Sequence, residues 1–425
     1  MKLLLKHKQI ANFYFFVGFA VIIFEALINR KVVSYISENG ILLWPSEFWF
    51  IVVGNTLLFV LFCANPFRLK IMNLIPILVV IFVLYFGFFH GLIVSNKFVM
   101  EEFRELCFHS LIIPPILFLS PHLNFSKSIK FGIFILVPVT FIWSIIAFRE
   151  RFYSGFEYTN RVYPFCASIC LSYCIIIFSH GKKTYLLFAL IFVIASVSQF
   201  SKTILTSLVF CLLFSLYCSS KINNDVRSFF LSKFNFKLLS YLFTSIIFLA
   251  SMLYVVDIYL GGMISLVIQA DFLKIRLSES GIITKGNLTG GRLEMWNASL
   301  KYWLESPFFG HGMGAVLNVY SSGWNEKSQL HNYLLQSLQN FGLFGFIIII
   351  TCSLKWISDS ISKLGNTLSF EDRIVNSCLL VFVLMTLVVG MYSHPLSTPT
   401  ISILFWFSLS YLSVQDSNNK FLTKY

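Results

Sequence analysis

Long runs of apolar residues, separated by short polar segments, dominate this chain. A helix that crosses a membrane needs about 20 consecutive apolar residues. By this measure the pattern predicts twelve spanning helices, over residues 10–29, 48–65, 71–94, 106–121, 129–148, 162–179, 184–199, 203–219, 238–257, 333–354, 374–392 and 396–414. The expected fold class is therefore all-α, a polytopic integral membrane protein. The fourth run is short and contains Pro114-Pro115, which predicts a broken or tilted helix.

One long polar segment, residues 258–332, interrupts the series of predicted spans. The sequence thus divides into nine spans (1–257), a loop with short amphipathic helices (258–332), and three spans with a tail (333–425). Loops of this length usually have a function. We find no internal repeat, which argues against the inverted-repeat transporters.

Composition agrees with the membrane assignment. Of 425 residues, 57% are hydrophobic and 12% are charged, whereas soluble domains average about 45–50% and about 25%. An ordinary soluble enzyme and a disordered chain are both excluded. The net charge of +13 would suggest nucleic acid in a soluble protein, but cytoplasmic loops of membrane proteins collect Lys and Arg. We therefore expect membrane lipid, and no nucleic acid, as a partner.

The distribution of positive charge predicts the orientation. With a cytoplasmic N-terminus, the inside segments contain 18 Lys and Arg, and the short outside loops contain eight. The rule that positive charge stays inside then places both termini in the cytoplasm and the 258–332 loop outside.

Few residues inside the predicted spans suggest chemistry. Glu25 is an isolated carboxylate, and we favour a hydrogen-bonded group near one membrane face over a proton pathway. Cys166, Cys170 and Cys174 share one helix face, where small apolar filling is favoured over a metal stripe. We expect no disulfide, no metal site and no cofactor.

The long loop carries the richest motifs. Gly290-Gly291 predicts a turn that leads into a helix from Arg292 to about Glu305, ended by Ser306-Pro307. The segment Gly310-His311-Gly312-Met313-Gly314 resembles a dinucleotide loop only superficially, because no strand precedes it. We favour a turn that lets the backbone approach another element.

Positive charges and a histidine gather on the predicted outer face. They include Arg161, Lys202, Arg292 and His331. These cations either surround an anionic ligand or are solvated charges partnered by nearby glutamates. Arg292 at a helix start suits a phosphate. His331 is either a structural interfacial residue or a general base, since its ordinary pKa lies near neutrality.

The order of these motifs resembles one family. Gly291-Arg292-x-x-x-Trp296, Pro307-x-x-Gly310-x-Gly312, His331-Asn332 and Gly342-x-x-Gly345 follow one another as in the O-antigen ligases and polymerases, glycosyltransferases of the bacterial envelope. The resemblance implies a twelve-helix protein of the inner membrane with a periplasmic catalytic face. It implies transfer of a glycan from undecaprenyl diphosphate onto lipid A–core oligosaccharide in ligases or onto a lipid-linked repeat unit in polymerases. No metal-binding carboxylate cluster stands out in the sequence, so we expect metal-independent transfer, and direct displacement would invert the anomeric configuration.

The resemblance also assigns roles to residues. It makes His331 and Arg292 catalytic, with Arg292 on the donor diphosphate. Lys202 stands where the family usually has arginine, and Arg161 is a further candidate diphosphate contact. The supporting residues are Asn332, Gly291, Gly310 and Gly312. The spacing from His331 to Gly345 favours a ligase; a polymerase is the alternative, and a polysaccharide transporter is less favoured.

Overall fold

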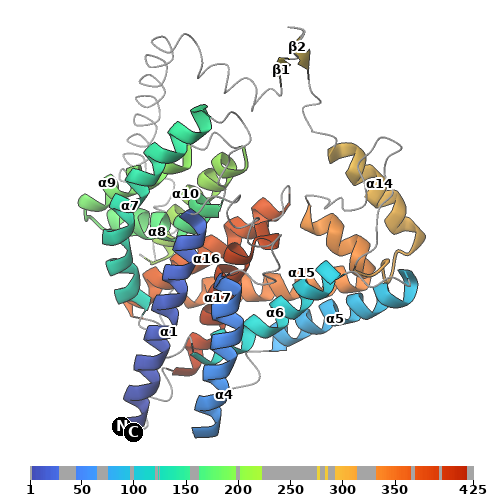
Figure 1. Cartoon of the computed structure of the whole chain (residues 1–425), viewed down its shortest axis with the longest axis horizontal. Helices are drawn as coiled ribbons and strands as arrows, with labels where there is room; N and C mark the ends of the chain where they lie inside the picture. Colours follow the sequence, from blue (N-terminus) through green and yellow to red (C-terminus); the bar gives the residue numbers. More distant parts are fainter. Residues whose placement is uncertain are drawn as a thin grey trace. The chain divides into compact units, whose positions relative to one another are not determined.

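The protein is almost entirely helical where its structure, a computed structural model, describes it (Figure 1). The described residues fall into two compact units. Unit 1 comprises Met1–Ser128, Arg292–Lys363 and Phe382–Tyr425, and unit 2 comprises Ile129–Gly291 and Leu364–Val381. The described residues are 2–27, 45–64, 75–95, 100–119, 123, 125–153, 162–197, 202–222, 275–277, 283–285, 292–313, 332–364, 369–391 and 395–418.

The described helices follow the predicted series of spans. Those of unit 1 are α1 (Lys2–Leu27), α3 (Pro45–Glu47), the π-helix η1 (Phe48–Val53), α4 (Gly54–Ala64), α5 (Ile75–Ser95), α6 (Met100–Leu119), α14 (Arg292–Glu305), α15 (Tyr333–Lys363), the 3-10 helix η5 (Pro395–Ser397) and α17 (Pro399–Asn418). Unit 2 contains α8 (Val162–Ser179), α9 (Thr184–Val197), α10 (Lys202–Ile222) and most of α7 (Phe125–Tyr153). The helix α16 (Phe370–Gly390) begins in unit 2 and ends in unit 1.

Every predicted span coincides with a described helix except 238–257, which lies outside the described residues. Among the described residues, three helices are long and apolar enough to cross a membrane: Ile204–Ile222, Tyr333–Ser362 and Phe370–Gly390. Several shorter apolar helices accompany them. The total of twelve spans and the division at 257 and 332 stay predictions.

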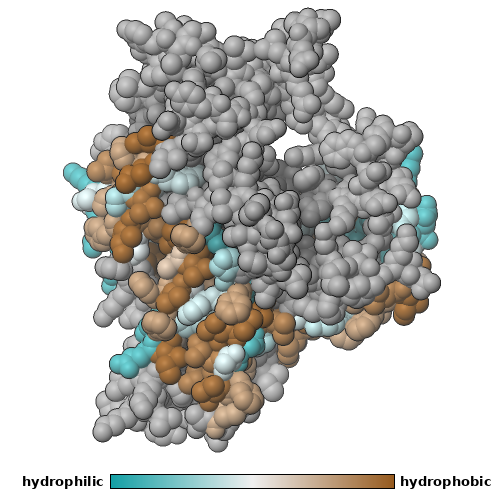
Figure 2. Space-filling view, viewed as in Figure 1, coloured by the Kyte–Doolittle hydropathy of each residue, from teal (hydrophilic) through white to brown (hydrophobic). Residues whose placement is uncertain are grey.

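The outer faces of the helices are apolar. On α5 the exposed fraction reaches 69% for Phe82 and 80% for Ile93, and apolar side chains also cover much of the described surface in Figure 2. Soluble proteins rarely expose apolar patches of more than a few hundred Å². Contact with lipid accounts for these faces, and the protein is a membrane protein.

The helix α6 continues through Pro114 and Pro115, so the predicted break is wrong. Proline has no N–H, so Pro115 leaves the carbonyl of Leu111 without its helical donor. The side-chain amide of Asn55, on α4, donates to that carbonyl at 2.9 Å. A neighbouring helix thus satisfies the freed backbone group, as spans that contain proline require.

Two short strands depart from the all-helical prediction. Ile275–Leu277 (β1) and Ile283–Lys285 (β2) pair antiparallel, with Arg276 opposite Thr284. β-Branched residues favour extended backbone, and the two segments are close enough in sequence to form a hairpin. The ribbon lies in the predicted long loop.

Contacts inside unit 1 join helix ends that the predicted orientation places on one side of the membrane. The amide of Leu396 donates to the hydroxyl of Tyr333, and both residues lie at predicted outer ends. The indole N–H of Trp356 donates to the hydroxyl of Ser413 at 2.5 Å, and both lie at predicted inner ends. Glu25 accepts 2.6 Å hydrogen bonds from the amide and hydroxyl of Ser46, which confirms that its carboxyl group is hydrogen-bonded.

Unit 2 shows the same agreement at the predicted inner side. Lys130 and Glu371 form a 2.7 Å ion pair. The guanidinium of Arg373 donates to the carbonyl of Ile222, at the last residue of α10, at 3.1 Å. A cation at a helix C-terminus is electrostatically favourable. These contacts agree with the predicted alternation of the helices, and the orientation itself stays a prediction.

Candidate functional site

The site is organised around α14, the helix of the predicted long loop. It runs from Arg292 to Glu305, the bounds that the sequence predicted. Just past its C-terminal end, the indole N–H of Trp303 donates to the carbonyl of Pro307 at 3.0 Å and holds the following turn against the helix. The chain then turns back, and the amide of Gly310 donates to the carbonyl of Ser306 at 3.0 Å.

Residues 306–313, which we call the clasp, enter the backbone ladder of α15. The amide of His311 donates to the carbonyl of Gln339 at 2.8 Å. The amide of Gly312 donates to the carbonyl of Asn340 at 3.0 Å. In an uninterrupted helix these two carbonyls would accept from residues 343 and 344.

The amides of those two residues bond to the clasp instead. Leu343 donates to the carbonyl of Pro307 at 2.8 Å, and Phe344 donates to that of Phe308 at 3.2 Å. Two helical bonds are therefore replaced by four bonds to the clasp. The break falls at Gly342, whose φ is 61° and ψ is −168°. The sequence predicted an unbroken span here; insertion of a backbone segment into the ladder explains the kink.

Glycines allow the clasp to lie directly on α5. Gly312 has a φ of 82°, and a Cβ on it would lie 2.2 Å from the Cα of Gly91. The amide of Met313 donates to the carbonyl of Gly87 at 2.9 Å. For the described residues 310–313, this close approach confirms the interpretation of the segment as a turn that brings the backbone to another element.

Two histidines stabilise the clasp. The ring of His311 stacks on Tyr302 at a centroid distance of 3.7 Å, and its Nε2 lies 2.7 Å from the carbonyl oxygen of Tyr302. Nε2 of His90, on α5, lies 3.2 Å from the carbonyl oxygen of Gly310. Burial, with a smaller contribution from Glu305, raises the pKa of Tyr302, which keeps its ring neutral. His311 is itself buried, so its role is structural.

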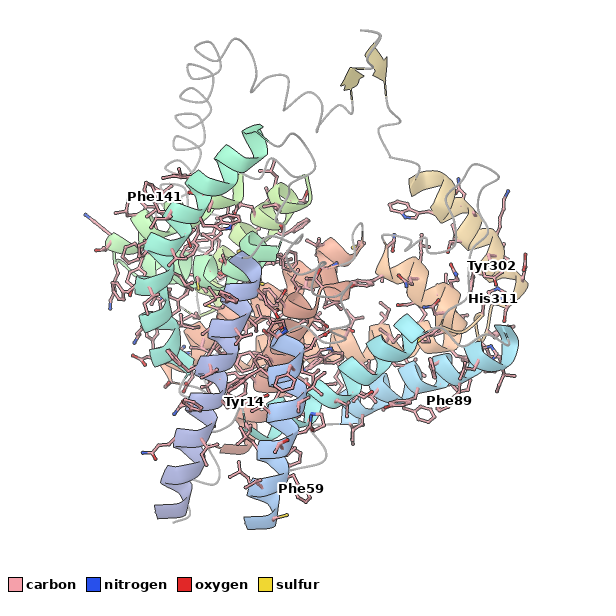
Figure 3. The ribbon with its side chains drawn as sticks, in the orientation of Figure 1. Tyr14, Phe59, Phe89, Phe141, Tyr302 and His311 are labelled. Atoms are coloured by element: carbon pink, nitrogen blue, oxygen red, sulfur yellow. The ribbon has the colours of Figure 1, made fainter. Side chains whose placement is uncertain are left out.

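The helix α14 and the first half of α15 run side by side in the same direction (Figure 3). Ser299 donates to Oε1 of Gln339 at 2.9 Å. Further along both helices, the clasp carbonyls at 307 and 308 meet the amides at 343 and 344. From Ser299 to Phe308, contacts therefore follow the same order along both segments. Arg292 and Asn332 each precede the Ser299–Gln339 contact by seven residues, about 10 Å of helix, so the two N-terminal ends lie at the same end of the pair.

Asn332 is the N-cap of α15. Its Oδ1 accepts hydrogen bonds from the amides of Leu334 at 3.0 Å and Leu335 at 3.1 Å. These are two of the N–H groups that the first turn of a helix leaves without helical partners. The asparagine of the His-Asn motif thus has a defined structural role at the helix start.

The remaining predicted site residues are described only in part. Arg292 is the first residue of α14 and Lys202 the first of α10, but their side chains lie outside the described residues. Arg161, Gly291 and His331 lie outside the described residues altogether. Their assigned roles therefore stay predictions.

The sequence interpretation missed Ser299 and Gln339. The available signal was the polar pair Gln339-Asn340 inside an apolar run, because a buried amide in a span needs a partner. Within the described parts of the chain, no group of His, Cys, Asp and Glu side chains is arranged to hold a metal ion.

Comparison with known proteins identifies the region that contains these features. A search of curated proteins found no match. Residues 167–350 match a family model described as O-antigen ligase. This stretch includes α14, the clasp, the N-cap of α15 and the break at Gly342. The match to this family model over residues 167–350 bears out the resemblance drawn from the motifs.

Proposed function

We propose that this protein is an O-antigen ligase. It transfers a glycan from undecaprenyl diphosphate to the lipid A–core oligosaccharide at the periplasmic face of the bacterial inner membrane. The proposal combines the family match over residues 167–350 with the roles that the motifs assign to Arg292 and His331.

The parallel packing of α14 and α15 is the observation that carries the proposal. Helix N-termini are partly positive, and the N-termini of α14 and α15 lie at one end of this pair. Arg292 begins α14, and His331 precedes the N-cap Asn332 by one peptide bond, about 3.8 Å between Cα atoms. A cation, two helix ends and an imidazole in this order suit a diphosphate and an acceptor hydroxyl.

In the proposed reaction His331 accepts the proton of an acceptor hydroxyl. The oxygen attacks the anomeric carbon of the donor sugar, and the bond from that carbon to the diphosphate oxygen breaks. Undecaprenyl diphosphate leaves with the bonding electron pair, and Arg292 stabilises the growing negative charge. Direct displacement inverts the anomeric configuration and requires no metal.

Lys202 and Arg161 are assigned to the donor diphosphate on the motif resemblance alone. Lys202 provides a point charge instead of the fork of an arginine. Substitution tests these two residues separately from Arg292 and His331.

Reconstitution tests the proposal. The purified protein would be incorporated into vesicles with lipid-linked glycan and either lipid A–core or a lipid-linked repeat unit as acceptor. A ligase extends only the core lipid. Extension of only the repeat unit would identify a polymerase, and no transfer to either acceptor would refute the enzymatic assignment.

Variants test the residues in the same assay. His331→Ala is expected to slow transfer by about 10²–10⁴-fold, and Arg292→Ala by about 10²–10³-fold. Lys301→Ala removes another cation, an exposed one on α14, and should leave transfer unchanged. Normal product from both His331→Ala and Arg292→Ala would show that the assigned site is wrong.

A further inference from the structure

Ser299 and Gln339 form a buried polar contact between α14 and α15. Their exposed fractions are 1% and 4%, and the Ser299 hydroxyl donates to Oε1 of Gln339 at 2.9 Å. A buried amide oxygen without a donor is costly. This contact therefore favours the observed arrangement of the two helices over others that would break the bond from Ser299.

Gln339 holds two segments at once. Its side chain accepts from Ser299 on α14, and its main-chain carbonyl accepts from the amide of His311 in the clasp at 2.8 Å. The main-chain bond fixes the clasp to α15. The side-chain bond fixes α14, whose first residue is Arg292.

The contact also specifies how far α14 is displaced along α15. One turn of helix is 5.4 Å, and a slip of about one turn would bring a much larger side chain to the position of Ser299, namely Met295, Trp296, Tyr302 or Trp303. The observed register of α14 is the one that places a small hydroxyl side chain against Oε1 of Gln339.

We propose that Ser299 and Gln339 are a positioning pair that sets the height of the start of α14, at Arg292, relative to the start of α15, at Asn332. The inference rests on the proposed function, because it takes Arg292 and His331, the residue before Asn332, as the groups that act on donor and acceptor. Ser299 and Gln339 touch neither substrate. They act through the register of the two helices that begin at the site.

Kinetics of Ser299→Ala test the pair in the vesicle assay with lipid-linked glycan and lipid A–core. A misplacement of about 1 Å can slow catalysis by about 10²-fold. We expect kcat to fall by about 10- to 100-fold while KM for the donor changes by less than about threefold, since Arg292 still reaches the donor diphosphate but the donor is no longer aligned with the acceptor hydroxyl. Ser299→Thr keeps the hydroxyl and should restore most of the rate.

Ser408→Ala is the matched control. Ser408 is also fully buried in unit 1, but its hydroxyl donates only to the carbonyl of Leu404 in its own helix, at 2.7 Å. It should keep the wild-type kcat. The same kcat for Ser299→Ala and Ser408→Ala would overturn the proposal.

A double variant tests the pair even if the larger threonine of Ser299→Thr does not fit at this buried position. Gln339→Met should lower kcat as Ser299→Ala does, and adding Ser299→Ala to it should cost no more. Additive losses would show that the two residues act separately and would refute a pair. If the wild-type protein transfers glycan and these variants transfer it at the same rate, the positioning role of the pair is refuted and the proposed function stands. If the wild-type protein transfers no glycan, the proposed function itself is refuted.

Discussion

Gly310 and Gly342 face each other backbone to backbone. A Cβ built on either residue would lie 2.5 Å from the amide nitrogen of the other, and both have positive φ, 71° and 61°. They belong to separate sequence motifs, one within the predicted long loop and one inside the tenth predicted span. In the structure the two motifs pack together, because the backbone N–H and C=O groups of the clasp pair with those at the break in α15.

Alanine at either glycine should destabilise the protein. A left-handed conformation costs an L-residue about 1–2 kcal/mol, and overpacking costs about 1–3 kcal/mol more. Thermal unfolding of the purified protein in detergent would measure the loss for Gly310→Ala and Gly342→Ala. Gly132→Ala is the control, because Gly132 lies inside α7 with no atom within 4 Å of the built Cβ. It should be neutral or stabilising. Equal unfolding temperatures for all three variants would contradict the close packing.

The sequence predicted a helix from Arg292 to about Glu305, and α14 has these bounds because its signals are local. A glycine pair precedes Arg292, and Ser306-Pro307 follows Glu305. The break at Gly342 was not predictable in this way. It depends on hydrogen bonds to the carbonyls of residues 307 and 308, which are far from Gly342 in sequence. No sequence pattern near Gly342 indicates these tertiary contacts.

The residues of the candidate site likewise fall into those that local sequence motifs identify and those that only tertiary packing identifies. The motifs identified which residue types suit a diphosphate and an acceptor hydroxyl, but not what holds them in place. Ser299 and Gln339 are ordinary polar residues in sequence, and only the packing of two helices gives them a joint role. Asn332 was assigned a supporting role, and its N-cap geometry supplies the physical reason.

Lys202→Arg tests whether this lysine occupies the place of the family's arginine. An arginine can contact a diphosphate with two N–H groups, so transfer should be retained or increased. The measurement is the amount of glycan-capped core lipid in cells, compared with Lys202→Ala, which should be impaired. Complete loss of product with Lys202→Arg would assign Lys202 a different role.

Substitutions of Asn332 distinguish its role as the N-cap of α15 from the effect of charge near the proposed diphosphate site. Asn332→Ser and Asn332→Asp both keep an N-cap oxygen, so both should preserve stability, whereas Asn332→Ala should lose about 1 kcal/mol. The aspartate adds a negative charge beside the proposed diphosphate site. Transfer should therefore fall with Asn332→Asp and not with Asn332→Ser, as measured by initial rates in vesicles. Equal rates for these two variants would place the diphosphate away from the start of α15.

Asn55 and Pro115 should be energetically coupled. Asn55→Leu removes the donor to the carbonyl of Leu111 and should cost about 1–3 kcal/mol, measured by thermal unfolding in detergent. The adjacent Thr56→Ala removes a hydroxyl that bonds only to the carbonyl of Val52, and it should be nearly neutral. Pro115→Ala restores an N–H four residues after Leu111. In that background Asn55→Leu should therefore cost much less. An unchanged cost would mean that Asn55 stabilises α4 through its other bond, to the carbonyl of Ile51, and not by satisfying the carbonyl that proline leaves free.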